Sequence, residues 1–116
     1  MATLKINRGT TYLISYNHQH DGVTEPLTGA TVFFTVKTTE YSSDTDDSDA
    51  VISKTITSHV DAAAGETEIE IEPDDTATLT PGTYFYDVIV KESDDRIYKV
   101  DEGKIKLDGS PTNRTA

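Results

Sequence analysis

Apolar and polar residues alternate along most of this chain, and the alternation predicts β-strands. Successive side chains of a strand point to opposite faces, so an alternating run buries one face and exposes the other. The clearest run covers residues 84–90, with Tyr84, Tyr86, Val88 and Val90 on the expected core face and Phe85, Asp87 and Ile89 on the outward face. Other alternating runs cover residues 3–8, 11–17, 30–37, 50–58, 66–72, 96–100 and 104–107.

Turn residues separate these runs at short intervals. Asp21-Gly22 and Asp94-Asp95 predict turns between neighbouring strands. Pro73 followed by two acidic residues predicts one short helical turn near 73–79, since proline and acidic side chains both favour a helix N-terminus. Seven or eight short strands without an amphipathic helix predict an all-β antiparallel sandwich or barrel in one domain, residues 1–108. Residues 109–116 are expected to form a flexible C-terminal tail.

A Pro-Gly turn leads directly into the clearest strand. Pro81 and Gly82 are followed by Tyr84, which is the placement of the tyrosine corner of β-sandwiches. In that corner the phenol bonds to backbone a few residues upstream. Tyr84 is therefore predicted to be structural.

Composition narrows the possible functions. The chain contains no cysteine, which excludes disulfides, thiol catalysis and thiolate metal sites. Its formal charge is −11, and residues 41–76 hold nearly all of the excess, with eleven acidic residues against Lys54 alone. Such a surface repels phosphate backbones, so no nucleic-acid partner is expected. No apolar run reaches the length of a membrane span and no signal peptide is evident, so no membrane partner is expected either.

Two polar segments raise the possibility of a metal site. The acidic loop at 44–49 carries Asp44, Asp46 and Asp49, but its spacing does not match a calcium-binding loop, and a solvated loop is the alternative. His18, His20 and Asp21 offer zinc ligands without a distant third partner, and surface histidines in a turn are the alternative.

No catalytic set emerges. The chain has no glycine-flanked serine elbow and no glycine-rich phosphate loop, and its carboxylates occur in runs where solvation is the default. We therefore expect no enzymatic activity and no cofactor.

Outward-facing apolar residues are the best candidates for a binding surface. Phe33 points outward from the run at 30–37, and Phe85 and Ile89 point outward from the run at 84–90. Exposed together, they form an apolar patch of the kind that marks a protein interface, including self-association into a homo-oligomer. The alternative is that loops cover this face, or that the predicted faces are reversed.

The order of several segments resembles a known group. Residues 4–11, 27–36, 61–71 and 74–88 follow one another as in small immunoglobulin-like virion proteins of tailed bacteriophages, including the N-terminal domain of upper baseplate proteins. The resemblance covers residues 3–107, and the segment from Leu79 to Tyr84 is also similar to the corner of fibronectin type III domains. It implies an immunoglobulin-like or fibronectin III-like antiparallel β-sandwich of 7–8 strands.

The same resemblance implies a function. It implies a non-enzymatic virion component, assembled in the host bacterial cytoplasm, that docks on other virion proteins of the tail, baseplate or capsid. The chain lacks the receptor-binding or coiled-coil extension of the baseplate proteins, so a head decoration or tail ornament fits its length better. The alternative is an adhesion module that binds host surface glycans through the loops 17–28 and 41–49, with Tyr41 stacking on a sugar.

Overall fold

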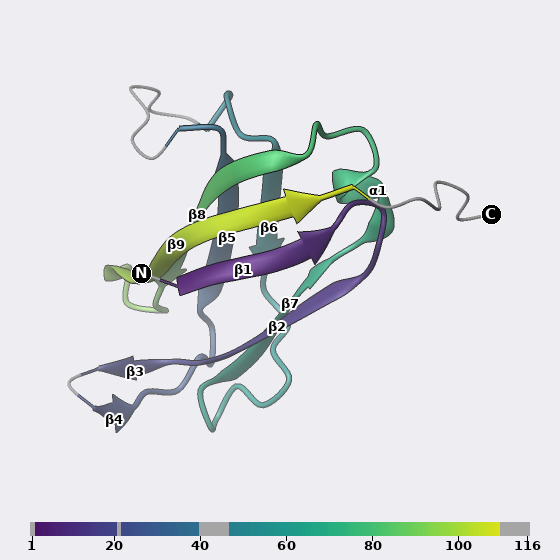
Figure 1. Ribbon diagram of the computed structural model, residues 1–116. Coiled ribbons are helices and arrows are strands. Elements are labelled where there is room, and N and C mark those ends of the chain that lie inside the picture. The colour runs from purple at the N-terminus through teal and green to yellow at the C-terminus, as the bar shows by residue number, and fades with distance from the viewer. Residues whose placement is uncertain (1, 21, 40–46, 110–116) are drawn as a thin grey trace.

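The computed structural model describes residues 2–20, 22–39 and 47–109, which form a two-layer β-sandwich (Figure 1). The elements, in chain order, are β1 (Ala2–Asn7), β2 (Tyr12–Asn17), β3 (Gln19–His20), β4 (Val23–Thr24), β5 (Thr31–Lys37), β6 (Ile52–Ile56), β7 (Glu66–Ile71), α1 (Pro73–Thr76), β8 (Gly82–Lys91) and β9 (Ile97–Asp108). No helix in the described residues is long and apolar enough to cross a membrane.

One layer is a five-stranded sheet and the other is a two-stranded sheet. The strand order of the large sheet is β1-β9-β8-β5-β6, and every pairing is antiparallel except β1 with β9, which is parallel. The small sheet pairs β2 with β7, and β3 and β4 form a separate short hairpin. This order places β5, β8 and β9 as strands C, F and G of an immunoglobulin sandwich, and β2 and β7 as strands B and E.

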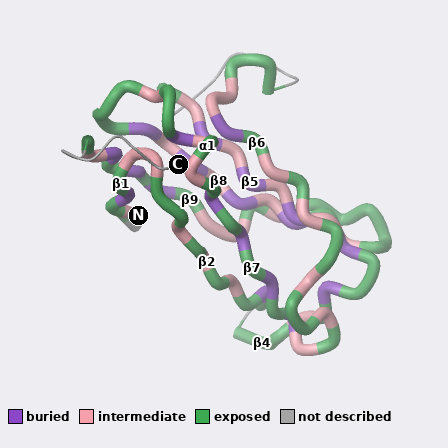
Figure 2. The backbone as a smooth tube through the Cα atoms, turned by 90° about the vertical axis from the view of Figure 1, so that its right-hand side faces the viewer, coloured by how far each residue is buried: buried purple, intermediate pink, exposed green. Residues whose placement is uncertain are grey.

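The core lies between the two layers. The burial pattern alternates along β5, β7 and β8, as the sequence pattern predicts, and Tyr84, Tyr86, Val88 and Val90 are all buried. Phe34 packs beside Tyr86, with ring centroids 5.7 Å apart. Figure 2 shows this alternation as buried segments that are separated by half-buried or exposed ones along the strands.

The strand predicted at 96–100 and the strand predicted at 104–107 are one continuous strand, β9. The two predicted runs leave residues 101–103 between them, but Gly103 lies buried within the strand, directly opposite Tyr86. A glycine leaves room beside a large cross-strand ring, so it can stay in the strand. The irregularity lies elsewhere: the register shifts between Val88 and Ile89 and leaves Val100 unpaired, as in a β-bulge.

The predicted helical turn is present but shorter than residues 73–79. Helix α1 has four residues, and its first turn is fixed by a reciprocal pair of contacts between Glu72 and Asp75. The backbone N–H of Glu72 donates to a carboxylate oxygen of Asp75 at 2.7 Å. Residues 77–79 then leave the helix as a turn that leads to Pro81.

Candidate functional site

The outer face of the five-stranded sheet brings two of the predicted interface residues together. Phe33 on β5 lies directly opposite Ile89 on β8 in the antiparallel register. Both side chains are half-buried, and both point away from the core because their strand neighbours Val32, Phe34, Val88 and Val90 are buried. The two side chains therefore form one apolar contact on the surface of the sheet.

Phe85 shares this face but lies apart from that pair. It sits four residues before Ile89 on β8, opposite Lys37 of β5 and Lys104 of β9. Asp87 lies between the two apolar positions on the same face. Burial, the largest cause, raises the pKa of the Asp87 carboxyl above its ordinary value, and Glu102 directly opposite adds to the rise.

A third apolar residue, Ile97, extends the Phe33–Ile89 pair onto β9. Its side chain is 63% exposed, and it lies opposite Lys91, diagonally next to Ile89. The outward direction of Ile97 could not be predicted from the sequence, because the bulge at Val100 determines which residues of this strand point outward. The apolar row thus crosses three strands: β5, β8 and β9.

Basic residues gather on the same face. Six of the ten lysine and arginine residues of the chain point outward from the five-stranded sheet: Lys5, Lys37, Lys91, Lys99, Lys104 and Lys106. The face is therefore basic, although the chain as a whole carries a formal charge of −11.

The lysines near the β5 end and the β8–β9 turn have acidic partners. Lys37 Nζ lies 3.0 Å from Asp47 and 2.8 Å from Asp49, and these two hydrogen bonds raise the pKa of the Lys37 ammonium above its ordinary range. Lys99 lies 3.3 Å from Glu102. The acidic partners in these pairs are all exposed, and pairs open to solvent contribute little stability, so their main effect is to neutralise charge locally.

The outer face of the small sheet has the opposite charge. Glu66, Glu68 and Glu70 alternate along β7 and are all exposed. Leu13 lies opposite Glu70 and is 53% exposed. The two outer faces of the sandwich thus differ in sign.

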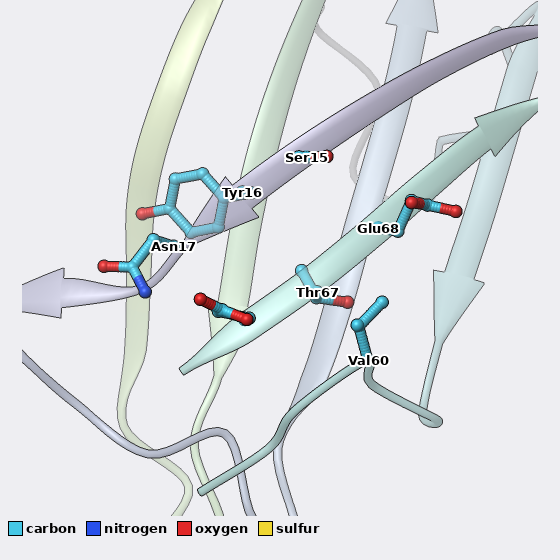
Figure 3. Close-up of a pocket in the computed structure, with 7 residues that line it drawn as sticks. Ser15, Tyr16, Asn17, Val60, Thr67 and Glu68 are labelled. Atoms are coloured by element: carbon cyan, nitrogen blue, oxygen red, sulfur yellow. The ribbon is translucent and has the colours of Figure 1, made fainter. Parts of the chain in front are cut away.

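A pocket of about 340 Å³ opens beside this acidic row (Figure 3). Residues from β2, from β7 and from the preceding loop line it: Ser15, Tyr16, Asn17, Val60, Glu66, Thr67 and Glu68. Figure 3 shows Val60 reaching from its loop toward Thr67 and Glu68 on β7. The lining combines one aromatic ring with amide, hydroxyl and carboxylate groups, which suits a polar ligand.

Tyrosines and a carboxylate fill the space between the two layers near β2. The Tyr86 hydroxyl donates to Asp101 at 3.3 Å, and burial together with this carboxylate raises the pKa of Tyr86 to about 12. Burial and the charge of Asp101 also raise the pKa of Tyr16. Tyr16 and Tyr86 therefore have a structural place between the two layers.

The prediction that the histidines at 18–20 lie on the surface is wrong for His18. This residue is 1% exposed, and its Nε2 lies 3.0 Å from a carboxylate oxygen of Glu92, while Nδ1 has no hydrogen-bond partner within the described ranges. His18 directly follows β2, and its backbone N–H donates to the carbonyl oxygen of Gly65 at 2.7 Å, which holds this residue against the loop before β7. The other two zinc candidates, Asp21 and the side chain of His20, lie outside the described part of the chain.

His59 also has a structural place. Its Nε2 lies 2.9 Å from the carbonyl oxygen of Ala30, and its Nδ1 lies 2.9 Å from the hydroxyl of Thr67. A carbonyl only accepts, so Nε2 carries the proton and Nδ1 accepts from the threonine hydroxyl in the neutral ring. His59 therefore ties β7 to the start of β5.

The residues that the structure describes contain no group of three metal-ligating side chains that could hold an ion. In the acidic loop, Asp49 contacts Lys37, whereas Asp44, Asp46 and the sugar-stacking candidate Tyr41 lie outside the described residues. The calcium and glycan hypotheses for this loop stay predictions.

The Pro-Gly turn before β8 has the geometry of a tyrosine corner. The Tyr84 hydroxyl donates to the Thr80 carbonyl oxygen at 2.6 Å, four residues upstream, and the ring is 8% exposed. The bond fixes the chain where it passes from α1 to β8.

No protein-family model matches this sequence, and comparison with the curated proteins gives no match. Among solved structures, the chain is similar to the PmoD soluble domain of Methylocystis sp. ATCC 49242 (Rockwell), with a TM-score of 0.50 and 7% identity over 89% of this chain and 76% of that one. It is also similar to the mouse leukocyte-associated immunoglobulin-like receptor 1 domain, with a TM-score of 0.49 and 16% identity over 90% and 86% of the two chains. Murine CRIg gives a TM-score of 0.39 and 14% identity over 93% and 92%.

The fold is an immunoglobulin-like β-sandwich. The strand order, the two-layer core and the Tyr84 corner all belong to that architecture. Identities this low concern the fold alone, because one sandwich architecture carries many unrelated functions.

Proposed function

We propose that this chain is a non-enzymatic interaction protein that docks on other proteins through the outer face of its five-stranded sheet. The observation that carries the proposal is the apolar row of Phe33, Ile89 and Ile97, which crosses three strands on a face that the second layer does not cover. Apolar side chains in contact on an exposed sheet face, rimmed by lysines, have the composition of a protein interface with a polar rim.

We further propose that the partners are other virion proteins of a tailed bacteriophage, with the chain serving as a tail, baseplate or capsid accessory protein. The support for this setting is the order of segments from residue 3 to residue 107, which resembles the small immunoglobulin-like proteins of such particles. A sheet face used for docking is compatible with that role.

The test is incorporation into purified phage particles. We expect mass spectrometry of banded particles to detect the chain at a fixed ratio to the major structural proteins. Ile97→Glu should reduce incorporation at least tenfold, since a charge buried in an apolar contact costs more than 1.4 kcal/mol. Val23→Glu is the matched control, because Val23 is also 63% exposed but lies on the β3–β4 hairpin. Absence of the chain from particles would refute the virion role.

A second candidate function is binding of host surface glycans. The pocket beside β7 supports it, since Tyr16, Asn17 and Glu68 together offer a ring and polar groups of the kind that hold a sugar. Glycan-array binding that Glu68→Ala removes would favour this function, and an array without any bound glycan would refute it.

A further inference from the structure

Three lysines lie together at one end of the outer face, and no acidic residue in the described part of the chain pairs with them. Lys5 on β1 is directly opposite Lys106 on β9 in the parallel register, and Lys104 lies two residues before Lys106 on the same face. All three side chains are exposed, and the described residues offer none of them an ion pair. Like charges in directly opposed strand positions destabilise a sheet. Repulsion among these lysines therefore lowers the stability of the isolated chain, and an anionic partner would remove that repulsion.

The chain itself carries a matching anionic row. Glu66, Glu68 and Glu70 on β7 are exposed, alternate along one strand face and have no ion pair among the described residues. We call Lys104 and Lys106 on β9, with Lys5 beside them on β1, the lysine row, and the three glutamates on β7 the glutamate row. Residues two positions apart in a β-strand are ~6.7 Å apart, so the charges along β9 and along β7 have the same repeat. Their spacings therefore agree.

One molecule cannot pair its own two rows. The lysines point outward from the five-stranded sheet and the glutamates point outward from the two-stranded sheet, on opposite sides of the core. Figure 1 shows β1 and β9 in one layer and β7 in the other. Contact between the rows requires a second copy.

Each row also has an apolar neighbour. Phe85 lies directly opposite Lys104 in the large sheet, and Leu13, 53% exposed, lies directly opposite Glu70 in the small sheet. When the lysine row of one copy meets the glutamate row of another, Phe85 and Leu13 can pack against each other beside the paired charges. Such a contact has the apolar centre and polar rim of a protein interface.

We propose that the outer face of β1 and β9 binds the outer face of β7 of a second copy, so that copies associate head to tail. This inference rests on the proposed docking function and names one partner of that sheet face. The contact is heterologous: in a bound pair, one copy still presents a free glutamate row and the other copy still presents a free lysine row. It therefore extends into a filament, or closes into a ring where the rotation permits.

The test is sedimentation velocity of the pure full chain at about 0.01 M and about 1 M ionic strength, where the Debye length falls from about 30 Å to about 3 Å. We expect species larger than a dimer at low salt and monomer at high salt. Lys104→Glu/Lys106→Glu reverses the basic row and Glu68→Lys/Glu70→Lys reverses the acidic row. Each variant alone should be monomeric at low salt.

Mixing these two variants is the decisive experiment. The intact lysine row of one variant meets the intact glutamate row of the other, and the two reversed rows are also opposite in charge. The mixture should therefore regain species larger than a dimer, in which the two variants alternate. The matched control is Lys91→Glu/Arg96→Glu, which makes the same change in net charge at exposed positions near the β8–β9 turn and should leave association unchanged. Circular dichroism and thermal unfolding confirm that each variant is folded.

Wild-type protein that stays monomeric at low salt would overturn the proposal, as would a mixture of the two variants that stays monomeric. Binding of duplex DNA to the monomer through the lysine row would also overturn the proposal, because the partner of the row would then be a polyanion and not a second copy. The virion role fails separately: a chain absent from particles but associating head to tail refutes that role and leaves this interface in place. A chain present in particles but monomeric at low salt refutes this interface alone.

Discussion

Nε2 of His18 lies 3.0 Å from a carboxylate oxygen of Glu92, and these two residues are 74 positions apart in the sequence. The ring is 1% exposed, and in the part of the chain that the structure describes only Glu92 forms a side-chain hydrogen bond with it. The contact ties the end of β2 to the turn between β8 and β9. It links the two layers at the edge of the sandwich.

We expect Glu92→Ala to lower the free energy of unfolding by about 1–3 kcal/mol, because it leaves the buried imidazole without a partner. Glu92→Gln keeps an acceptor and should cost less. Urea denaturation at pH 7 measures both. If His18→Phe/Glu92→Ala is no more stable than Glu92→Ala alone, an unpaired imidazole is not the reason for the loss.

Tyr84→Phe should destabilise the protein by about 1–2 kcal/mol, since it removes the hydrogen bond to the Thr80 carbonyl and keeps the ring. Tyr12→Phe is the matched control, because none of the described residues forms a hydrogen bond with the Tyr12 hydroxyl. Equal urea midpoints for Tyr84→Phe and wild type would contradict a stabilising role for the corner.

Two glycines with positive φ predict different costs for the same substitution. A Cβ on Gly65 (φ +72°) would lie 2.4 Å from the Glu25 carbonyl oxygen, whereas a Cβ on Gly22 (φ +80°) meets nothing within 4 Å. Gly22→Ala should cost only the left-handed backbone term, about 1–2 kcal/mol. Gly65→Ala adds a backbone clash and should cost roughly 2–5 kcal/mol. Thermal unfolding of both variants checks the order, and equal losses would contradict it.

Alkaline pH should weaken the fold through Tyr86. Burial and Asp101 raise the pKa of this phenol to about 12 in the folded protein, above the ordinary value of 10.0. Between these two values the unfolded chain has lost the proton and the folded chain still holds it, so stability falls as pH rises from about 10 to about 12. Tyr86→Phe should flatten this loss. Phenolate absorbance at increasing pH should also lose its latest-titrating component, and an unchanged titration would contradict the prediction.

The strands could be predicted because their signal is local. Alternation in residues 30–37 and 66–72 is enough to separate buried from exposed positions, and the placement of Tyr84 after Pro81-Gly82 is enough to suggest its corner. These features depend on neighbours within one strand or one turn.

The features that could not be predicted from the sequence depend on contacts between segments that are far apart along the chain. The burial of His18 requires Glu92 and residue 65, and the exposure of Ile97 requires the bulge at Val100. The lysine cluster requires the parallel pairing of β1 with β9, which no periodicity within either strand specifies. Phe33 and Ile89 could be named from alternation alone, whereas the extension of their row to Ile97 and the lysine cluster became visible only when the strand order was known.

The parallel pairing of β1 with β9 has a mechanical consequence. Six residue pairs join the two strands, from Ala2 opposite Gly103 to Asn7 opposite Asp108. A pull that separates Ala2 from Asp108 acts along the strand direction, so it loads the whole ladder in shear and cannot open it one bond at a time. The same ladder would open bond by bond only under a force applied across the strands, and the sandwich therefore resists extension along β1 more than peeling at its edge.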